Sequence, residues 1–163
     1  MMQIERTFKI ESSQEPIRFS PVGGDLEKIG LTRDKVELLP SHGRHEKLTI
    51  GLLICDEEEE VTLPVLQDWC DKNHWRFATG FELADLHEQL FKKVFKKLRD
   101  EKVEDYSELS LLQQVVALGD NHKGCHVATS VPQWDWVLTF YAPKECLRSS
   151  FKFAVVKVAS QET

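Results

Sequence analysis

Residues 79–102 read TGFELADLHEQLFKKVFKKLRDEK and carry the strongest structural signal in the chain. Thr79 followed by Glu82 fits a capping box, in which the hydroxyl and the carboxylate each satisfy a free backbone N–H at the start of a helix. Apolar residues then recur at helical spacing on one side, namely Leu83, Leu86, Leu90, Phe91, Val94, Phe95 and Leu98. Acids lie toward the start and bases toward the end, which complements the helix dipole. The stretch therefore predicts a long amphipathic helix that packs against the core.

One polar residue, His87, interrupts the apolar stripe of this helix. A core-facing imidazole destabilises the fold if its nitrogens find no hydrogen-bond partner. Two interpretations follow from the sequence. His87 is either a core histidine whose hydrogen bonds are satisfied, or a site residue at the base of a cleft with its pKa set by burial.

The rest of the chain predicts strands and two shorter helices. Strands are expected at residues 2–10, 48–55, 75–78, 126–131, 134–141 and 151–158, and helices at 63–73 and 105–118. The first strand alternates apolar and polar residues and only Arg6 breaks its apolar side, whereas the second is apolar on both faces. The last three strands suggest an antiparallel meander.

These elements predict an α+β protein in which residues 1–163 form a single globular domain. We expect a mostly antiparallel sheet of about five to seven strands. About three helices would pack on one face of that sheet. The long helix would cover that face, opposite Trp134, Trp136 and Phe140.

Charge and cysteine content limit the classes of function. The formal net charge is −6, which disfavours general binding to nucleic acid or anionic membranes. The chain has no signal peptide pattern and no apolar run long enough to span a bilayer. Its four cysteines are widely spaced, which is typical of reduced thiols. We therefore expect a soluble, acidic, cytoplasmic protein.

The loop at residues 120–126, DNHKGCH, holds the best candidates for chemistry. His122, Cys125 and His126 are all potential zinc ligands. Cys125 and His126 are consecutive, so they would point to opposite faces of a strand and only two of the three ligands would converge. The same loop can instead be interpreted as a nucleophile site, with Cys125 activated by a distant histidine.

Two further patterns have both a functional and a structural explanation. Trp134 and Trp136 share one face of a predicted strand, where they would form either a stacking platform for a ligand or part of the core. Lys92, Lys93, Lys96, Lys97 and Arg99 would form either a nucleic-acid contact or a solvated helix face. The sequence contains no GxSxG, HExxH, P-loop or kinase motif.

Three hypotheses about function follow. The first is a non-catalytic binding or regulatory module, such as an inhibitor, an immunity-type protein or an adaptor, with another protein as partner. The alternative is a small Cys/His-based enzyme or zinc-binding protein that uses the loop from His122 to His126. The third is nucleic-acid contact through the basic stretch from Lys92 to Arg99. The sequence identifies no cofactor and no oligomeric state.

Overall fold

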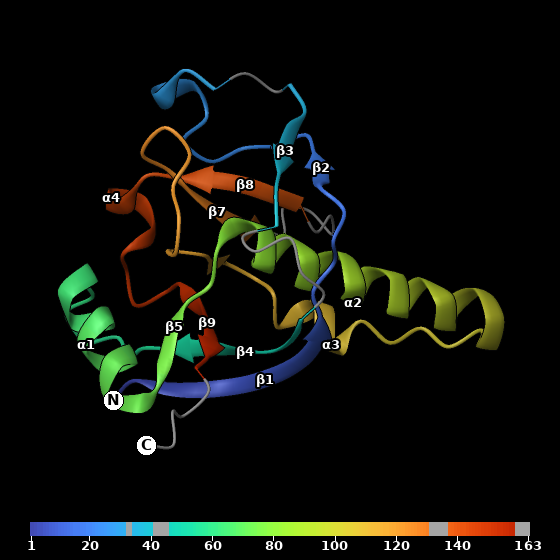
Figure 1. Ribbon diagram of the computed structural model, residues 1–163, viewed down its shortest axis with the longest axis horizontal. Helices are drawn as coiled ribbons and strands as arrows, with labels where there is room; N and C mark the ends of the chain where they lie inside the picture. The colour runs from blue at the N-terminus through green and yellow to red at the C-terminus, as the bar shows by residue number, and fades with distance from the viewer. Residues whose placement is uncertain (32–33, 41–45, 131–136, 159–163) are drawn as a thin grey trace.

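The long helix predicted from residues 79–102 forms as α2 (Gly80–Glu101) in the computed structural model, which describes residues 1–31, 34–40, 46–130 and 137–158. The predicted capping box is confirmed. The Thr79 hydroxyl accepts the Glu82 N–H at 3.2 Å, and the Glu82 carboxylate accepts the Thr79 N–H at 2.9 Å. Figure 1 shows the C-terminal half of α2 running beyond the sheet.

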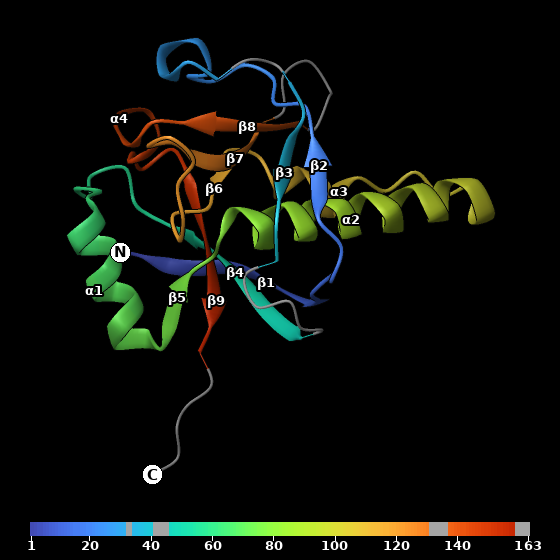
Figure 2. The ribbon, with the colours of Figure 1, turned by 45° about the horizontal axis from the view of Figure 1, so that its top comes forward.

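The predicted α+β architecture is confirmed in the described residues, which form a seven-stranded, mostly antiparallel sheet beside a two-stranded one (Figures 1 and 2). The larger sheet consists of β1 (Gln3–Glu11), β4 (Lys47–Ile54), β5 (Trp75–Phe77), β6 (Val115–Val116), β7 (His126–Ser130), β8 (Val137–Tyr141) and β9 (Lys152–Lys157). Its strand order is β1-β4-β9-β6-β7-β8, and β5 also pairs with β9. The smaller sheet joins β2 (Ile17–Phe19) to β3 (Val36–Leu38).

The helices pack on both faces of the large sheet, not on one face as predicted. Apolar residues of α2 and of α3 (Ser107–Ser110) share a buried cluster with Ala154 and Val156 of β9. Residues of α1 (Leu63–Asn73) and α4 (Pro143–Cys146) form a second buried cluster with Phe153 and Val155 of the same strand. Successive side chains of a strand point to opposite faces, so β9 needs apolar cover on both.

A β-bulge between Ile4 and Arg6 changes which way the ends of β1 face. The sequence predicted Met2, Ile4, Phe8 and Ile10 on one side of the strand. In the structure Ile4 pairs with Leu53 and packs with the α1 cluster, whereas Phe8 pairs with Ile50 and packs with the α2 cluster. The extra residue of a bulge shifts the alternation by one position, so Ile4 and Phe8 face opposite sides of the sheet.

The helix predicted over residues 105–118 is wrong beyond its first turn. Helix α3 ends at Ser110, and Gln114 has a left-handed φ of 51° that no helix continues through. The chain then enters β6, where the Thr129 hydroxyl accepts the Val115 N–H at 3.0 Å. Leu109 in α3 and Leu112 just after it are nevertheless fully buried against α2, so their spacing reflected burial in the core and not a helix that continues to residue 118.

The C-terminal strands form only part of the predicted meander. Strands β7 and β8 pair as an antiparallel hairpin, as expected. Strand β9, however, lies in the middle of the sheet between β4 and β6, and it runs parallel to β6. Trp134 and Trp136 lie outside the described residues, so their placement opposite the helix stays a prediction.

Candidate functional site

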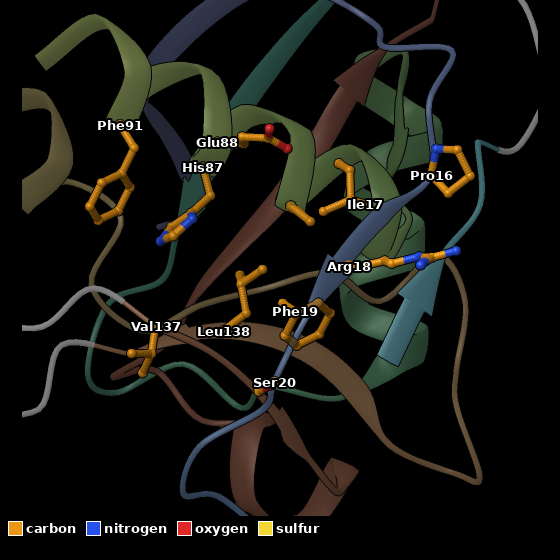
Figure 3. Close-up of a pocket in the computed structure, with 11 residues that line it drawn as sticks. Pro16, Ile17, Arg18, Phe19, Ser20, His87, Glu88, Phe91, Val137 and Leu138 are labelled. Carbon is orange, nitrogen blue, oxygen red and sulfur yellow. The ribbon is translucent and has the colours of Figure 1, made fainter. Parts of the chain in front are cut away.

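A pocket of about 440 Å³ lies where α2, β2 and β8 meet (Figure 3). Its walls come from segments that are far apart in the sequence. They are formed by Pro16, Ile17, Arg18, Phe19, Ser20, Ala84, His87, Glu88, Phe91, Val137 and Leu138. The volume falls in the range of ligand pockets in proteins, about 300–1,000 Å³.

Polar side chains of α2 hold the segment that leads into β2. Asp85 is buried, and its carboxylate accepts the Ser13 N–H at 2.7 Å. The Gln89 side-chain amide donates to the Glu11 carbonyl at 2.8 Å and to Asp85 at 2.9 Å. These bonds join the end of β1 to the helix, so they fix the distance between β2 and α2 across the pocket.

The segment after β2 covers the outer edge of β8. The Val22 N–H donates to the Leu138 carbonyl at 3.3 Å, and the Asp25 N–H donates to the Phe140 carbonyl at 3.0 Å. The Asp25 carboxylate in turn accepts the Ala142 N–H at 3.0 Å. Gly24 makes this approach possible, because its φ is +66° and a Cβ there would lie 2.4 Å from the Phe140 oxygen.

His87 lines the pocket from α2, as one of the two interpretations of the sequence required. Its Nε2 is buried and makes no hydrogen bond within the described part of the chain. Burial lowers the pKa of His87 to about 4, against a smaller opposing effect of the Glu88 carboxylate. The imidazole is therefore neutral near pH 7, and its buried Nε2 is left without a hydrogen bond in the described part of the chain.

The loop at residues 120–126 is a tight hairpin. His122 and Cys125 pair through their backbones, and Lys123 and Gly124 both have positive φ, 53° and 85°. Two successive left-handed residues are the signature of a type I′ turn, which joins antiparallel strands. The turn therefore explains why a glycine stands at position 124, between the paired residues His122 and Cys125.

The side chains of this hairpin face different surroundings. Cys125 is fully buried, and burial raises the pKa of its thiol, with the Asp25 carboxylate adding to the effect. A nucleophilic cysteine needs the opposite shift. His126 Nδ1 lies 2.8 Å from the Asp120 carbonyl oxygen, and His122 packs edge-on against Phe140. Among all described residues, no three His, Cys, Asp or Glu side chains are placed to hold a metal ion.

Asp120 instead connects the hairpin to α2. Its carboxylate accepts the Gly80 N–H, the first of the helix, at 2.8 Å and lies 3.6 Å from His122 Nε2. Burial opposes the charged form, but His122 and the Gly80 N–H outweigh it, so the pKa of Asp120 lies below its ordinary value. The carboxylate stabilises the start of the helix that carries His87.

Three bases of the stretch from Lys92 to Arg99 are in ion pairs. Lys92 lies 2.9 Å from Glu88, Lys93 lies 3.0 Å from Glu108, and Arg99 lies 3.1 Å from Asp100. Exposed pairs of this kind reduce the local positive field. The geometry therefore adds no support to nucleic-acid contact.

Sequence reasoning identified one wall of the pocket and missed the other two. His87 was visible because a polar residue in an apolar stripe is unusual. Phe19 and Leu138 carried no signal of their own, since their roles depend on how β2 and β8 are placed against α2. Trp134 and Trp136, proposed as pocket residues, fall outside the described residues.

No helix in the described ranges is long and apolar enough to cross a membrane. Comparison of the chain with protein-family models, with curated proteins and with solved structures finds no match.

Proposed function

We propose that the protein is a non-catalytic binding module whose binding site is the pocket between α2, β2 and β8. The observation that carries this proposal is His87, which lines a pocket of about 440 Å³ and whose buried Nε2 has no partner among the described residues. A buried nitrogen left without a hydrogen bond costs about 1–3 kcal/mol. A bound molecule with a complementary polar group would remove that cost.

The same geometry favours binding over catalysis. His87 Nε2 makes no hydrogen bond to an orienting carboxylate in the described part of the structure. Its pKa of about 4 also makes it a weak base at neutral pH. The other candidate for chemistry, Cys125, is buried with its pKa raised. Neither residue has the surroundings of an activated base or nucleophile.

The test is an amide NMR titration with p-cresol, a small neutral phenol that combines an apolar ring with one polar group. We expect the shifted resonances to belong to α2, β2 and β8. Ala84 lines the pocket from α2, so the larger side chain of Ala84→Phe should occupy part of the pocket and abolish the response. Val65→Phe places the same side chain on the exposed side of α1 and serves as the matched control.

The proposal is wrong if p-cresol shifts no resonance of these three elements in the wild-type protein. It is equally wrong if the Ala84→Phe variant, shown to be folded by its amide spectrum, responds as strongly as the Val65→Phe variant.

A further inference from the structure

We infer that the pocket takes the aromatic side chain of an extended peptide that pairs with the free edge of β2. This inference rests on the proposed binding function and adds the class of ligand: a peptide strand with a neutral ring that ends in a hydroxyl group. Three independent features of the pocket support it, namely its strand edge, its polar group and its charge balance.

The first feature is the edge of β2. Five consecutive residues, 16–20, line the pocket. Because side chains of a strand alternate between its two faces, consecutive residues share a surface only where the backbone edge is exposed. Strand β2 pairs with β3 along one edge. In the described part of the structure no strand pairs with the other edge, where an added strand would meet backbone N–H and C=O groups.

The second feature is the combination of apolar side chains in the pocket lining with the buried Nε2 of His87. Phe19, Phe91 and Leu138 surround the space that His87 faces (Figure 3). Neutral imidazole presents Nε2 as a donor or as an acceptor, depending on its tautomer. A phenolic hydroxyl both donates and accepts, so it matches either tautomer while its ring fills the apolar space. Tyrosine is the natural side chain with this chemistry.

The third feature is the charge balance of the walls. Arg18 lies 2.7 Å from Glu37, and Glu88 lies 2.9 Å from Lys92. Each charged residue of the pocket thus already has a counter-ion. A charged ligand would lose its hydration beside a neutral imidazole without gaining an unpaired opposite charge. The balance favours an uncharged occupant.

The apolar surface also extends past the pocket. Phe91 stacks on Phe95 with ring centroids 5.6 Å apart, and Phe95 is 52 % exposed. The two rings together form exposed apolar surface that continues from the pocket. A single small molecule would leave it uncovered, whereas a chain that leaves the pocket along α2 would contact it.

The test uses the capped peptide Ac-Val-Thr-Tyr-Thr-Val-NH₂, in which Val, Tyr and Val share one face, with affinity measured by NMR titration. Changing Tyr to Phe in the peptide, or His87→Phe in the protein, should each weaken binding by about tenfold. Both changes together should weaken binding little more than either change alone, since they remove the same hydrogen bond.

Two peptides methylated on backbone nitrogen test the strand pairing. One carries methyl groups on both Thr residues and the other on Tyr, so they block opposite edges of the peptide strand. We expect one of the two to bind nearly as well as the parent and the other not at all. Phe95→Ala should lower the affinity for the peptide and leave the affinity for p-cresol unchanged.

The outcomes separate this inference from the proposed function. If p-cresol binds at His87 and the parent peptide does not, strand pairing is refuted and the pocket stands as a binding site. Equal binding of both methylated peptides also refutes it. If neither p-cresol nor the peptide binds, both proposals fail.

Discussion

The ring of His87 lies 4.7 Å from the ring of Phe91, measured between centroids, with their planes tilted by 48°. The two residues are one helical turn apart, so α2 itself holds them together. The contact places an imidazole against an apolar ring and away from water. The pKa of His87 falls to about 4 chiefly because burial disfavours its charged form.

This pKa predicts how stability depends on pH. Below pH 6.5 the unfolded chain binds a proton at His87, while the folded chain resists doing so down to about pH 4. The free energy of unfolding should therefore fall as pH drops through this window, by at most about 3 kcal/mol from this residue. Urea unfolding at pH 7 and at pH 4.5 measures the fall.

His87→Phe is the matched variant, because it keeps an aromatic ring and cannot titrate. The other histidines are unchanged, so the difference in slope between the two proteins isolates His87. Identical slopes for wild type and variant would show that His87 titrates normally and is not buried as described.

The Arg76–Glu82 ion pair should be a major contributor to the stability of α2. Arg76 binds both carboxylate oxygens of Glu82, at 2.8 and 2.7 Å, and Glu82 is only 4 % exposed. Arg76→Ala leaves that carboxylate buried without its counter-ion. We expect a loss of about 3 kcal/mol, at the lower end for a broken buried pair because Arg76 itself is partly exposed.

Arg18→Ala is a suitable control in the same denaturation experiment. It breaks a pair with Glu37 at a similar distance, 2.7 Å, but both side chains are exposed. Its cost should be below about 1 kcal/mol. Equal losses of unfolding free energy in the two variants would mean that the burial of Glu82 does not determine how much its ion pair contributes to stability.

Two neighbouring glycines in the segment after β2 provide a sharper comparison. Gly23 and Gly24 have similar positive φ, 74° and 66°, but a Cβ at Gly23 meets nothing within 4 Å. Gly23→Ala should cost about 1 kcal/mol from backbone strain alone. Gly24→Ala adds a collision with the Phe140 carbonyl, and we expect about 3 kcal/mol or more. Similar thermal unfolding midpoints for both variants would contradict the close contact with β8.

Cys125 should react slowly with thiol reagents at neutral pH. The thiol is fully buried, and burial raises its pKa, so little thiolate is present or accessible. Mass spectrometry after brief iodoacetamide treatment should find Cys125 labelled more slowly than a free cysteine, and labelled readily in denaturant. Faster labelling than free cysteine in the folded protein would revive the nucleophile hypothesis.

The sequence predicted those parts of the fold that local chemistry determines. Helices α1 and α2 have N-caps, Thr62 and Thr79, followed by apolar stripes, and both form where expected. The stretch at residues 105–118 had similar spacing, but only the short helix α3 forms there. Leu109 of α3 and Leu112 just after it are both buried in the core. Spacing alone does not separate these cases, because burial against α2 requires only that the side chains point the same way.

The pocket was less predictable than its central residue. His87 could be identified because a polar residue in a helical apolar stripe needs a partner. The walls from β2 and β8 depend on long-range pairing, such as the bond from Val22 to Leu138 and the bond from Ser13 to Asp85. Such contacts between distant segments leave no periodic pattern in the sequence.

The most direct test of the central claim is the set of intermolecular NOEs between p-cresol and the protein. If the pocket is the binding site, the ring protons of p-cresol should show NOEs to the His87 and Phe91 rings, and these should disappear in Ala84→Phe. NOEs confined to another part of the surface, such as the smaller hollow of about 280 Å³ between Lys9 and Thr49 on β1 and β4, would contradict the account.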